Sequence, residues 1–133
     1  MSVVRPGPLV LLVDDDSDFR EAVREMLHDR GFASVVEAAD GRQAVVLAER
    51  LGPDVVLMDV KMPVLGGIEA ARAMRRLRPE LPIIMLTAYD DNGIRNEALA
   101  AGVDTYLLKG CSPSSIIDEL LKAGGTGDGH PRP

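Results

Sequence analysis

Four apolar segments of the chain each end in polar side chains that can do chemistry. These side chains are Asp14 with Asp15, Asp59, Thr87 and Lys109. Carboxylates that gather in one place repel one another and need a cation to share. The added hydroxyl and amine can bind the oxygens of an anion. Together these residue types predict a site for a divalent cation and a phosphoryl group.

Apolar runs alternate with helical patterns along the whole chain, and this alternation places the polar residues. The expected strands are 9–13, 32–38, 54–58, 82–86 and 105–108. The expected helices are 17–30, 41–51, 68–77, 92–101 and 113–122. Asp16, Asp40 and Ser112 stand where helix N-caps are expected, and Gly31, Gly52 and Gly102 where helices stop.

Near-continuous apolar strands with helical crossovers indicate a parallel sheet that is covered on both faces. Right-handed crossovers and five strands favour a flavodoxin-like α/β fold, a (βα)5 three-layer sandwich of strand order 2-1-3-4-5. In that order the first, third, fourth and fifth strands end side by side. Ligands of such folds bind at this carboxyl edge. The fold therefore predicts that Asp14, Asp15, Asp59, Thr87 and Lys109 converge in one crevice.

Length and composition limit the class of protein. The 133 residues suffice for one domain, and a net charge of -6 argues against direct binding of nucleic acid. The single cysteine excludes an internal disulfide, and neither a signal peptide nor an apolar stretch of ~20 residues is recognised. We expect a cytoplasmic domain without membrane contact. Residues 1–123 form the expected domain, and the Gly- and Pro-rich residues 124–133 are an expected flexible tail or linker.

The residue types predict phosphoryl transfer to a carboxylate. Asp14 and Asp15 offer hard oxygens that suit Mg²⁺, which prefers one or two carboxylates, waters and a phosphate. Asp59 can then act as the nucleophile and form an aspartyl phosphate. Lys109 would neutralise one phosphoryl oxygen, and Thr87 would donate a hydrogen bond to another. The main-chain carbonyl of Lys61 is a further expected metal ligand.

The ordered set of motifs resembles the receiver domains of two-component response regulators. The motifs are Val13-Asp14-Asp15-Asp16, Asp59-Val60-Lys61-Met62-Pro63, Leu86-Thr87-Ala88 and Tyr106-Leu107-Leu108-Lys109. The resemblance covers about residues 9–122. It implies that Asp59 is the phosphoacceptor and is phosphorylated by a sensor histidine kinase. It also implies that the domain is a switch and not an enzyme. It also implies that Thr87 is the switch hydroxyl and that Tyr106 is the aromatic that rotates inward with it.

Two positions depart from the family pattern. Gly110 follows Lys109 where the family often has proline after a cis peptide, and Gly66 stands where Asp is common. The segment Tyr106 to Gly110 is similar to receivers that precede LuxR-type helix-turn-helix domains. That similarity implies transcription regulation through a C-terminal effector, so the tail indicates either a stand-alone receiver or a truncated two-domain regulator. A second copy could dock on activation to form a homodimer where the surface changes, at the helix after Thr87, the Tyr106 strand and the final helix.

The acidic residues also match the patterns of other sites. An EF-hand calcium loop is rejected because Phe19 occupies the position that needs glycine. A small Mg²⁺-dependent phosphatase that uses Asp14 as its nucleophile stays open, although it leaves Asp59 without a role. A receiver-like binding module that is never phosphorylated stays open as well. A flavodoxin is less suitable because acids replace the residues that would hold a flavin phosphate.

Overall fold

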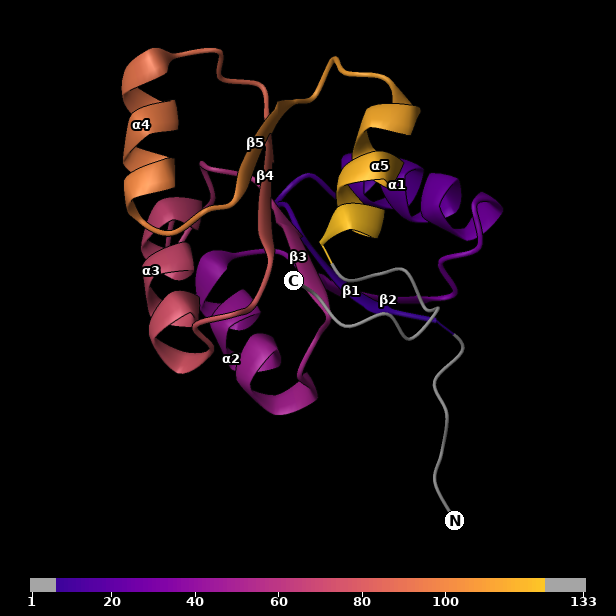
Figure 1. Ribbon diagram of the computed structural model, residues 1–133, viewed down its shortest axis with the longest axis horizontal. Coiled ribbons are helices and arrows are strands. Elements are labelled where there is room, and N and C mark those ends of the chain that lie inside the picture. Colours follow the sequence, from indigo (N-terminus) through magenta and orange to yellow (C-terminus); the bar gives the residue numbers. More distant parts are fainter. Residues whose placement is uncertain (1–6, 124–133) are drawn as a thin grey trace.

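The computed structural model describes residues 7–123, which form five strands and five helices in strict alternation (Figure 1). The strands are β1 (Leu9–Val13), β2 (Ser34–Ala38), β3 (Val55–Met58), β4 (Ile83–Thr87) and β5 (Thr105–Leu108). The helices are α1 (Ser17–Asp29), α2 (Gly41–Leu51), α3 (Gly67–Leu77), α4 (Asn92–Ala100) and α5 (Pro113–Lys122). Every predicted element is present, and its bounds differ from the prediction by at most two residues.

Side-chain caps fix where the helices begin. The Asp16 carboxylate accepts hydrogen bonds from the main-chain N–H groups of Asp18 and Phe19 at the start of α1. Asp40 and Ser112 accept equivalent bonds at the starts of α2 and α5, as predicted. Asp91 caps α4 in the same way. These oxygens satisfy N–H groups that lack a partner within the helix.

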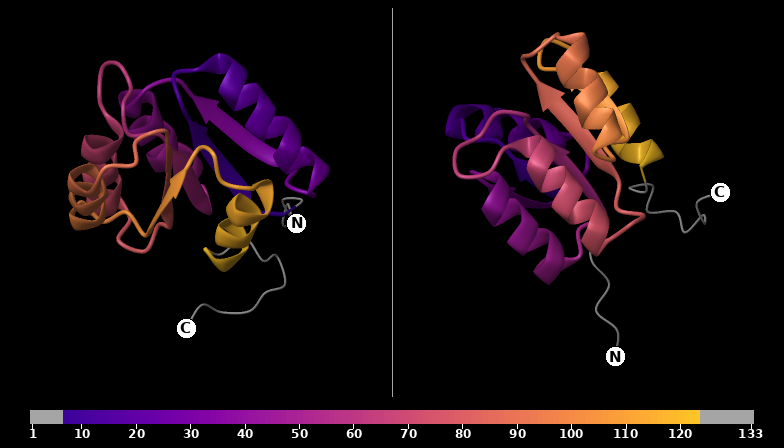
Figure 2. Two further views of the ribbon diagram at one scale, coloured as in Figure 1. Left: turned by 90° about the horizontal axis from the view of Figure 1, so that it is seen from above. Right: turned by 90° about the vertical axis from the view of Figure 1, so that its left-hand side faces the viewer.

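The five strands form one parallel sheet of order β2-β1-β3-β4-β5, which confirms the predicted topology. Helices α1 and α5 lie on one face of the sheet, and α2, α3 and α4 lie on the other (Figures 1 and 2). The result is the expected three-layer sandwich. The carboxyl ends of β1, β3, β4 and β5 therefore lie along one edge.

Two apolar clusters fill the spaces between the layers, and successive residues of β1 alternate between them. Leu11 and Val13 pack with residues from α2, α3 and α4, whereas Val10 and Leu12 pack with residues from α1 and α5. All five residues of β1 are buried. A strand that is apolar on both faces is typical of a central position in a doubly covered sheet.

The loop between β3 and α3 is held close to the end of β3. The N–H of Gly67 donates a 2.6 Å hydrogen bond to the carbonyl oxygen of Val60. A Cβ atom at Gly67 would lie 1.9 Å from the carbonyl oxygen of Asp59, so only glycine fits this approach. In the same loop Val64 has a positive φ of 68° and is 74% exposed. Gly67 therefore allows the backbone that follows Asp59 to fold back against the end of β3.

Candidate functional site

Main-chain hydrogen bonds extend the sheet by one residue past three of the strand ends and so position the polar side chains. The N–H of Asp14 donates to the carbonyl of Ala38, and the N–H of Asp59 donates to that of Val13. The N–H of Lys109 donates to the carbonyl of Thr87 at 2.8 Å. Residues from β1, β3, β4 and β5 therefore lie along one edge of the sheet, as predicted.

The Lys109 ammonium joins the acids of two different strand ends. Its Nζ atom lies 2.9 Å from Oδ2 of Asp14 and 3.1 Å from Oδ2 of Asp59. Both carboxylates are nearly inaccessible, with residue exposures of 1% for Asp14 and 6% for Asp59. Buried charges of one sign are costly unless a counter-charge accompanies them. One amine therefore serves two buried acids.

Three carboxylates can share a cation. Oxygen atoms of Asp14, Asp15 and Asp59 all lie within 4.8 Å of one another. Asp15 is exposed, whereas the other two are buried. This set of hard oxygens with one side open to water fits Mg²⁺, which keeps several waters when it binds proteins. The acidic residues named from the sequence are thus brought together in a geometry that suits a metal site.

Burial and ion pairing act in opposite directions on these groups. Burial raises the pKa of the Asp14 carboxyl, with a further increase from Asp59, and outweighs the hydrogen bonds from Lys109 and Asp16. Burial would lower the pKa of the Lys109 ammonium, but its hydrogen bonds to Asp14 and Asp59 raise it overall. The amine is therefore held in its charged form, and the acids remain crowded.

Each oxygen of the Asp59 carboxylate has a hydrogen-bond partner. Oδ1 accepts a 2.7 Å hydrogen bond from the N–H of Val60, and Oδ2 faces Lys109. The main chain of the same residue packs against Gly67. Asp59 thus has a defined orientation at the end of β3.

Thr87 and Tyr106 are linked through one intermediate residue. Thr87 is fully buried, and its Oγ1 atom accepts a hydrogen bond of 3.4 Å from the N–H of Tyr89. The Tyr106 hydroxyl donates a 2.6 Å hydrogen bond to the carbonyl of Tyr89. The Tyr106 ring is half-buried and lies 5.2 Å from the Arg95 guanidinium. Burial of the ring raises the pKa of the Tyr106 hydroxyl.

Lys61 lies beside the same tyrosine. Its ammonium is 4.5 Å from the centroid of the Tyr89 ring, which is an attractive cation–π distance. The predicted role of the Lys61 main-chain carbonyl as a metal ligand stays a prediction. The peptide bond between Lys109 and Gly110 is trans, since the described part of the chain contains no cis peptide bond.

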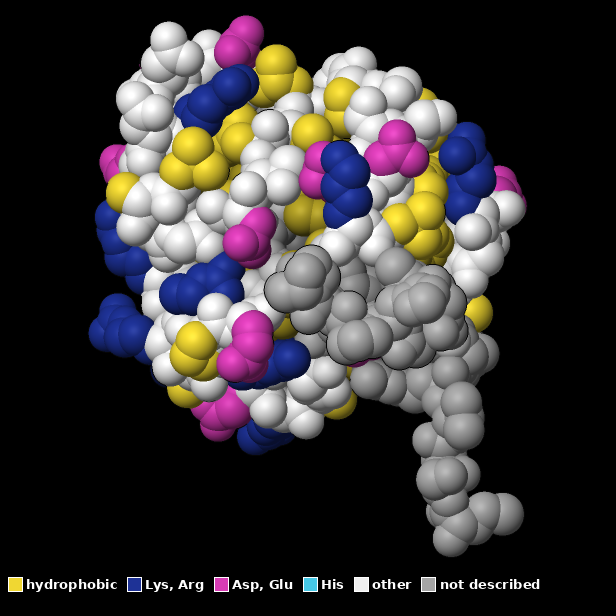
Figure 3. All heavy atoms as spheres, in the orientation of Figure 1, with side chains coloured by type: hydrophobic (Ala, Val, Ile, Leu, Met, Phe, Trp, Pro, Cys, Tyr) yellow, Lys and Arg dark blue, Asp and Glu magenta, His cyan; other side chains and the backbone are white. Residues whose placement is uncertain are grey.

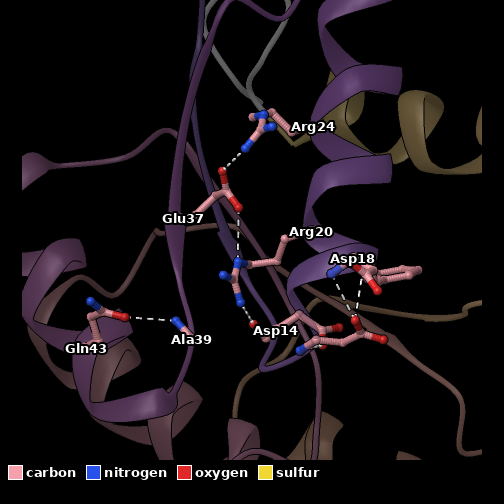
Figure 4. A network of polar contacts seen from close by, with 9 residues as sticks. Asp14, Asp18, Arg20, Arg24, Glu37, Ala39 and Gln43 are labelled. Carbon is pink, nitrogen blue, oxygen red and sulfur yellow. Dashed lines mark hydrogen bonds and ion pairs between the residues drawn. The ribbon is translucent and has the colours of Figure 1, made fainter.

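Sequence reasoning missed an arginine and glutamate network behind the acids (Figure 4). The Arg20 guanidinium donates to the carbonyl of Asp14 and to the carboxylate of Glu37, and Arg24 binds the other oxygen of Glu37. Arg20 and Arg24 are one turn apart on α1, and this spacing could have predicted a shared acidic partner. The network ties β2 and α1 to the main chain of Asp14.

Comparisons with known proteins agree with this geometry. Residues 10–121 match the family described as "Response regulator receiver domain". The chain is 39% identical over 112 residues to the response regulator UvrY of Escherichia coli K12, covering 84% of this chain and 51% of UvrY. It is 33% identical over 116 residues to the chemotaxis protein CheY of Thermotoga maritima, covering 87% of this chain and 97% of CheY.

A solved structure supports the same assignment. The two-component response regulator of the LuxR family from Aurantimonas sp. SI85-9A1 superimposes with a TM-score of 0.79 and 34% identity. The match covers 84% of this chain and 81% of that one. The chain belongs to the response regulator receiver domain family, whose members act in two-component signalling and are not primarily enzymes.

The length of the match differs between relatives. The chain spans about half of UvrY, at 51%, but nearly all of CheY, at 97%.

Within residues 7–123, no helix is long and apolar enough to cross a bilayer. Lys, Arg, Asp and Glu side chains are interspersed over the face shown in Figure 3 and form no single-sign surface there.

Proposed function

We propose that this receiver accepts a phosphoryl group on Asp59 from a sensor histidine kinase. The observation that carries the proposal is the position of the Lys109 ammonium, which bridges Asp59 and Asp14 within 3.1 Å beside the exposed Asp15. A receiver needs a carboxylate nucleophile, a metal site and a cation at the phosphoryl oxygens. The family match supports the same function, because receivers are the phosphorylated partners of histidine kinases.

The proposed metal ligands are the carboxylates of Asp14, Asp15 and Asp59 and the main-chain carbonyl of Lys61. Mg²⁺ bound there would supply positive charge that neutralises phosphoryl oxygens. One oxygen from each of the three carboxylates lies within 4.8 Å of the other two, and this clustering of hard oxygens supports this choice of cation. Each of these ligand assignments is a proposal from the donor types and their positions.

In the proposed reaction, a carboxylate oxygen of Asp59 attacks the phosphorus of a phosphohistidine on the kinase. A new oxygen–phosphorus bond forms as the phosphorus–nitrogen bond breaks, and the electron pair of that bond stays on the imidazole nitrogen. Lys109 would neutralise charge on one phosphoryl oxygen, and Thr87 would donate its hydroxyl proton in a hydrogen bond to another. Positioning and charge neutralisation account for most of the catalysis in such a transfer.

The proposed output is a change of surface near Thr87 and Tyr106. A phosphoryl group adds about -1.5 to -2 charges, and Thr87 would turn toward it. The N–H of Tyr89 would then lose its acceptor on Thr87, and Tyr106 is bonded to the carbonyl of that same Tyr89. Helix α4 follows directly and buries only Ala98 within its helical residues, so few anchors resist its displacement.

The proposal includes partners and setting. We place the receiver at residues 1–123 in the cytoplasm, followed by the linker 124–133. Residues 1–6 and 124–133 lie outside the described residues. A second copy on activation and DNA binding through a C-terminal effector fit the likeness to a LuxR-family regulator. The chain itself would make no direct contact with nucleic acid. Because the match spans half of UvrY, an effector in the full gene product is consistent with the relative's length.

Intact mass measured after incubation with acetyl phosphate and Mg²⁺ tests the proposal. The parent protein should gain one phosphoryl group, and Asp59→Asn should gain none while it remains folded. Asp14→Asn should react more slowly because its metal site is weaker. An adduct that persists in Asp59→Asn and maps to Asp14 would favour the phosphatase alternative. A parent protein that takes up no phosphoryl group would favour the binding module that is never phosphorylated.

A further inference from the structure

The Lys109 ammonium has a third neighbour besides its two carboxylates. Its Nζ atom lies 4.3 Å from the centroid of the Phe19 ring, in addition to Asp14 and Asp59. This distance is well within the range of cation–π attraction. Phe19 belongs to α1, the helix that follows β1, whereas Lys109 follows β5. The ring therefore reaches across to the amine from a separate element.

The position of Lys109 gives it a particular need for such a contact. The strand before it, β5, is an edge strand whose four residues are only partly buried. Gly110 after it is exposed and has no neighbour within 4 Å of its Cβ position. A long lysine side chain on such a backbone has considerable conformational freedom, which costs free energy to restrict. Contacts at the ammonium end must therefore fix where the charge lies.

The Phe19 ring is itself well placed to restrict that freedom. The N–H of Phe19 donates a hydrogen bond to the Asp16 carboxylate, which caps α1. The ring is half-buried and packs against the apolar cluster between the sheet, α1 and α5. Asp14, Asp15 and Phe19 thus belong to one short segment whose geometry the cap fixes. The segment that supplies two acids also supplies the ring.

We infer that Phe19 is a positioning residue, which holds the Lys109 ammonium between Asp14 and the reacting carboxylate of Asp59. This inference rests on the proposed phosphoryl acceptance at Asp59. An aromatic face attracts a cation without accepting one of its N–H groups in a conventional hydrogen bond. The three N–H groups of the amine thus remain for Asp14, Asp59 and an incoming phosphoryl oxygen. A third carboxylate in place of the ring would instead compete for the amine.

A series of substitutions at Phe19 separates electrostatic positioning from packing. Phe19→Leu keeps an apolar side chain but removes the aromatic face, and it should slow phosphorylation by acetyl phosphate roughly 3- to 30-fold, the range that a cation–π contact of this kind can supply. Phe19→Tyr and Phe19→Trp should retain most of the rate. Pentafluorophenylalanine at position 19 has a similar shape and a reversed ring charge distribution, so it should slow the reaction at least as much as leucine.

Two measurements make the result specific. The matched control is Met26→Leu, a half-buried position of the same helix and the same apolar cluster, which should leave the rate unchanged. Beryllofluoride affinity in the presence of Mg²⁺, measured by titration, should weaken in the same order as the rates. Thermal melting of each variant should show that the order of rates does not follow the order of stabilities.

The outcomes distinguish this inference from the proposed function. If the parent protein reacts at Asp59 and pentafluorophenylalanine supports the same rate as phenylalanine, the ring only packs and the inference is overturned. Equal rates for Phe19→Leu and the parent would overturn it as well. If the parent protein does not react at all, the proposed function fails first. A phosphorylation rate that falls as the ring attracts a cation less strongly supports both the positioning role of Phe19 and the proposed function.

Discussion

The hydroxyl of Tyr106 donates a 2.6 Å hydrogen bond to the carbonyl of Tyr89, the residue whose N–H donates to the Thr87 hydroxyl. The side chain on β5 is thereby connected to the hydroxyl at the end of β4 through a single peptide segment. A movement of Thr87 would remove one of these two hydrogen bonds to the main chain of Tyr89. The connection is short enough for a local change at the site to reach the start of α4.

Tyr106→Phe should loosen the segment between β4 and α4 while leaving Asp59 able to react. The Tyr89 carbonyl would lose its donor, and a hydrogen bond of this kind contributes about 1 kcal/mol, so hydrogen exchange of residues 88–91 should accelerate about fivefold. Amide exchange followed by NMR measures the effect. Tyr89→Phe is the matched control, because it removes a hydroxyl but keeps the carbonyl acceptor. Equal exchange in Tyr106→Phe and the parent would show that the bond does not restrain this segment.

Mg²⁺ should stabilise the folded protein through the carboxylate cluster. A ligand that binds only the folded state at about ten times its Kd adds roughly 1.4 kcal/mol to the free energy of unfolding. Melting curves with and without millimolar Mg²⁺ should therefore show an upward shift in the parent protein. The shift should vanish in Asp15→Ala, in which the exposed member of the cluster is removed. A parent protein whose melting ignores Mg²⁺ would contradict the metal site.

Gly67→Ala should damage the site through the main chain of Asp59. The added Cβ would lie 1.9 Å from the Asp59 carbonyl oxygen, so the backbone must move. Displacement of a reacting group by about 1 Å can lower a rate roughly 100-fold. The rate of phosphorylation by acetyl phosphate should therefore fall by up to about 100-fold. Gly110→Ala is the control, because its Cβ would have no neighbour within 4 Å. Similar rates for the two variants would argue against this role of Gly67.

Val64→Gly should stabilise the protein. Val64 is a β-branched residue at a φ of 68° and is 74% exposed, so it has a strained backbone with little burial in return. Relief of this strain should add about 1 kcal/mol to the free energy of unfolding, since the left-handed region costs an L-residue roughly 1–2 kcal/mol. Urea unfolding measures the change. Val46→Gly, at an exposed valine within α2, should destabilise instead, and a loss in both variants would contradict the prediction.

Glu37 should make stability depend on pH. Burial would raise the pKa of its carboxyl, but the hydrogen bonds from Arg24 and Arg20 lower it below its usual value of 4.5. A lowered pKa means that the stabilisation is present above the ordinary pKa and is lost as the pH falls through the lowered value. Glu37→Gln should therefore cost about 1 kcal/mol at pH 7 and much less at strongly acidic pH. Glu49→Gln, at an exposed position of α2, should cost little at either pH.

The fold could be predicted from the sequence because each strand and each helix has its own local pattern. The apolar runs, the caps Asp16, Asp40 and Ser112, and the glycine stops mark the elements independently of one another. Parallel topology then follows from helical crossovers, and the strand ends must share one edge. That geometric necessity is also why the convergence of Asp14, Asp59 and Lys109 could be predicted.

The missed contacts depend on helix rotation and side-chain reach, which no local pattern fixes. Phe19 looks like an ordinary core residue of α1 until its ring is seen beside Lys109. Tyr89 has no motif of its own, yet its main chain connects Thr87 and Tyr106. Glu37 lies on a strand whose acidic residue could face either solvent or a helix. Such pairings are set by how the layers pack.

The bridge from Lys109 to Asp14 and Asp59 has a consequence for how the protein is made. The amine follows the last strand of the chain, and it neutralises acids that follow the first and the third. A nascent chain in which β5 has not yet been synthesised would have to bury these two carboxylates without the Lys109 ammonium. Folding of the earlier strands is therefore expected to remain incomplete during translation until the fifth strand leaves the ribosome. The proposed phosphoacceptor Asp59 would consequently lack its Lys109 neighbour until the chain is complete.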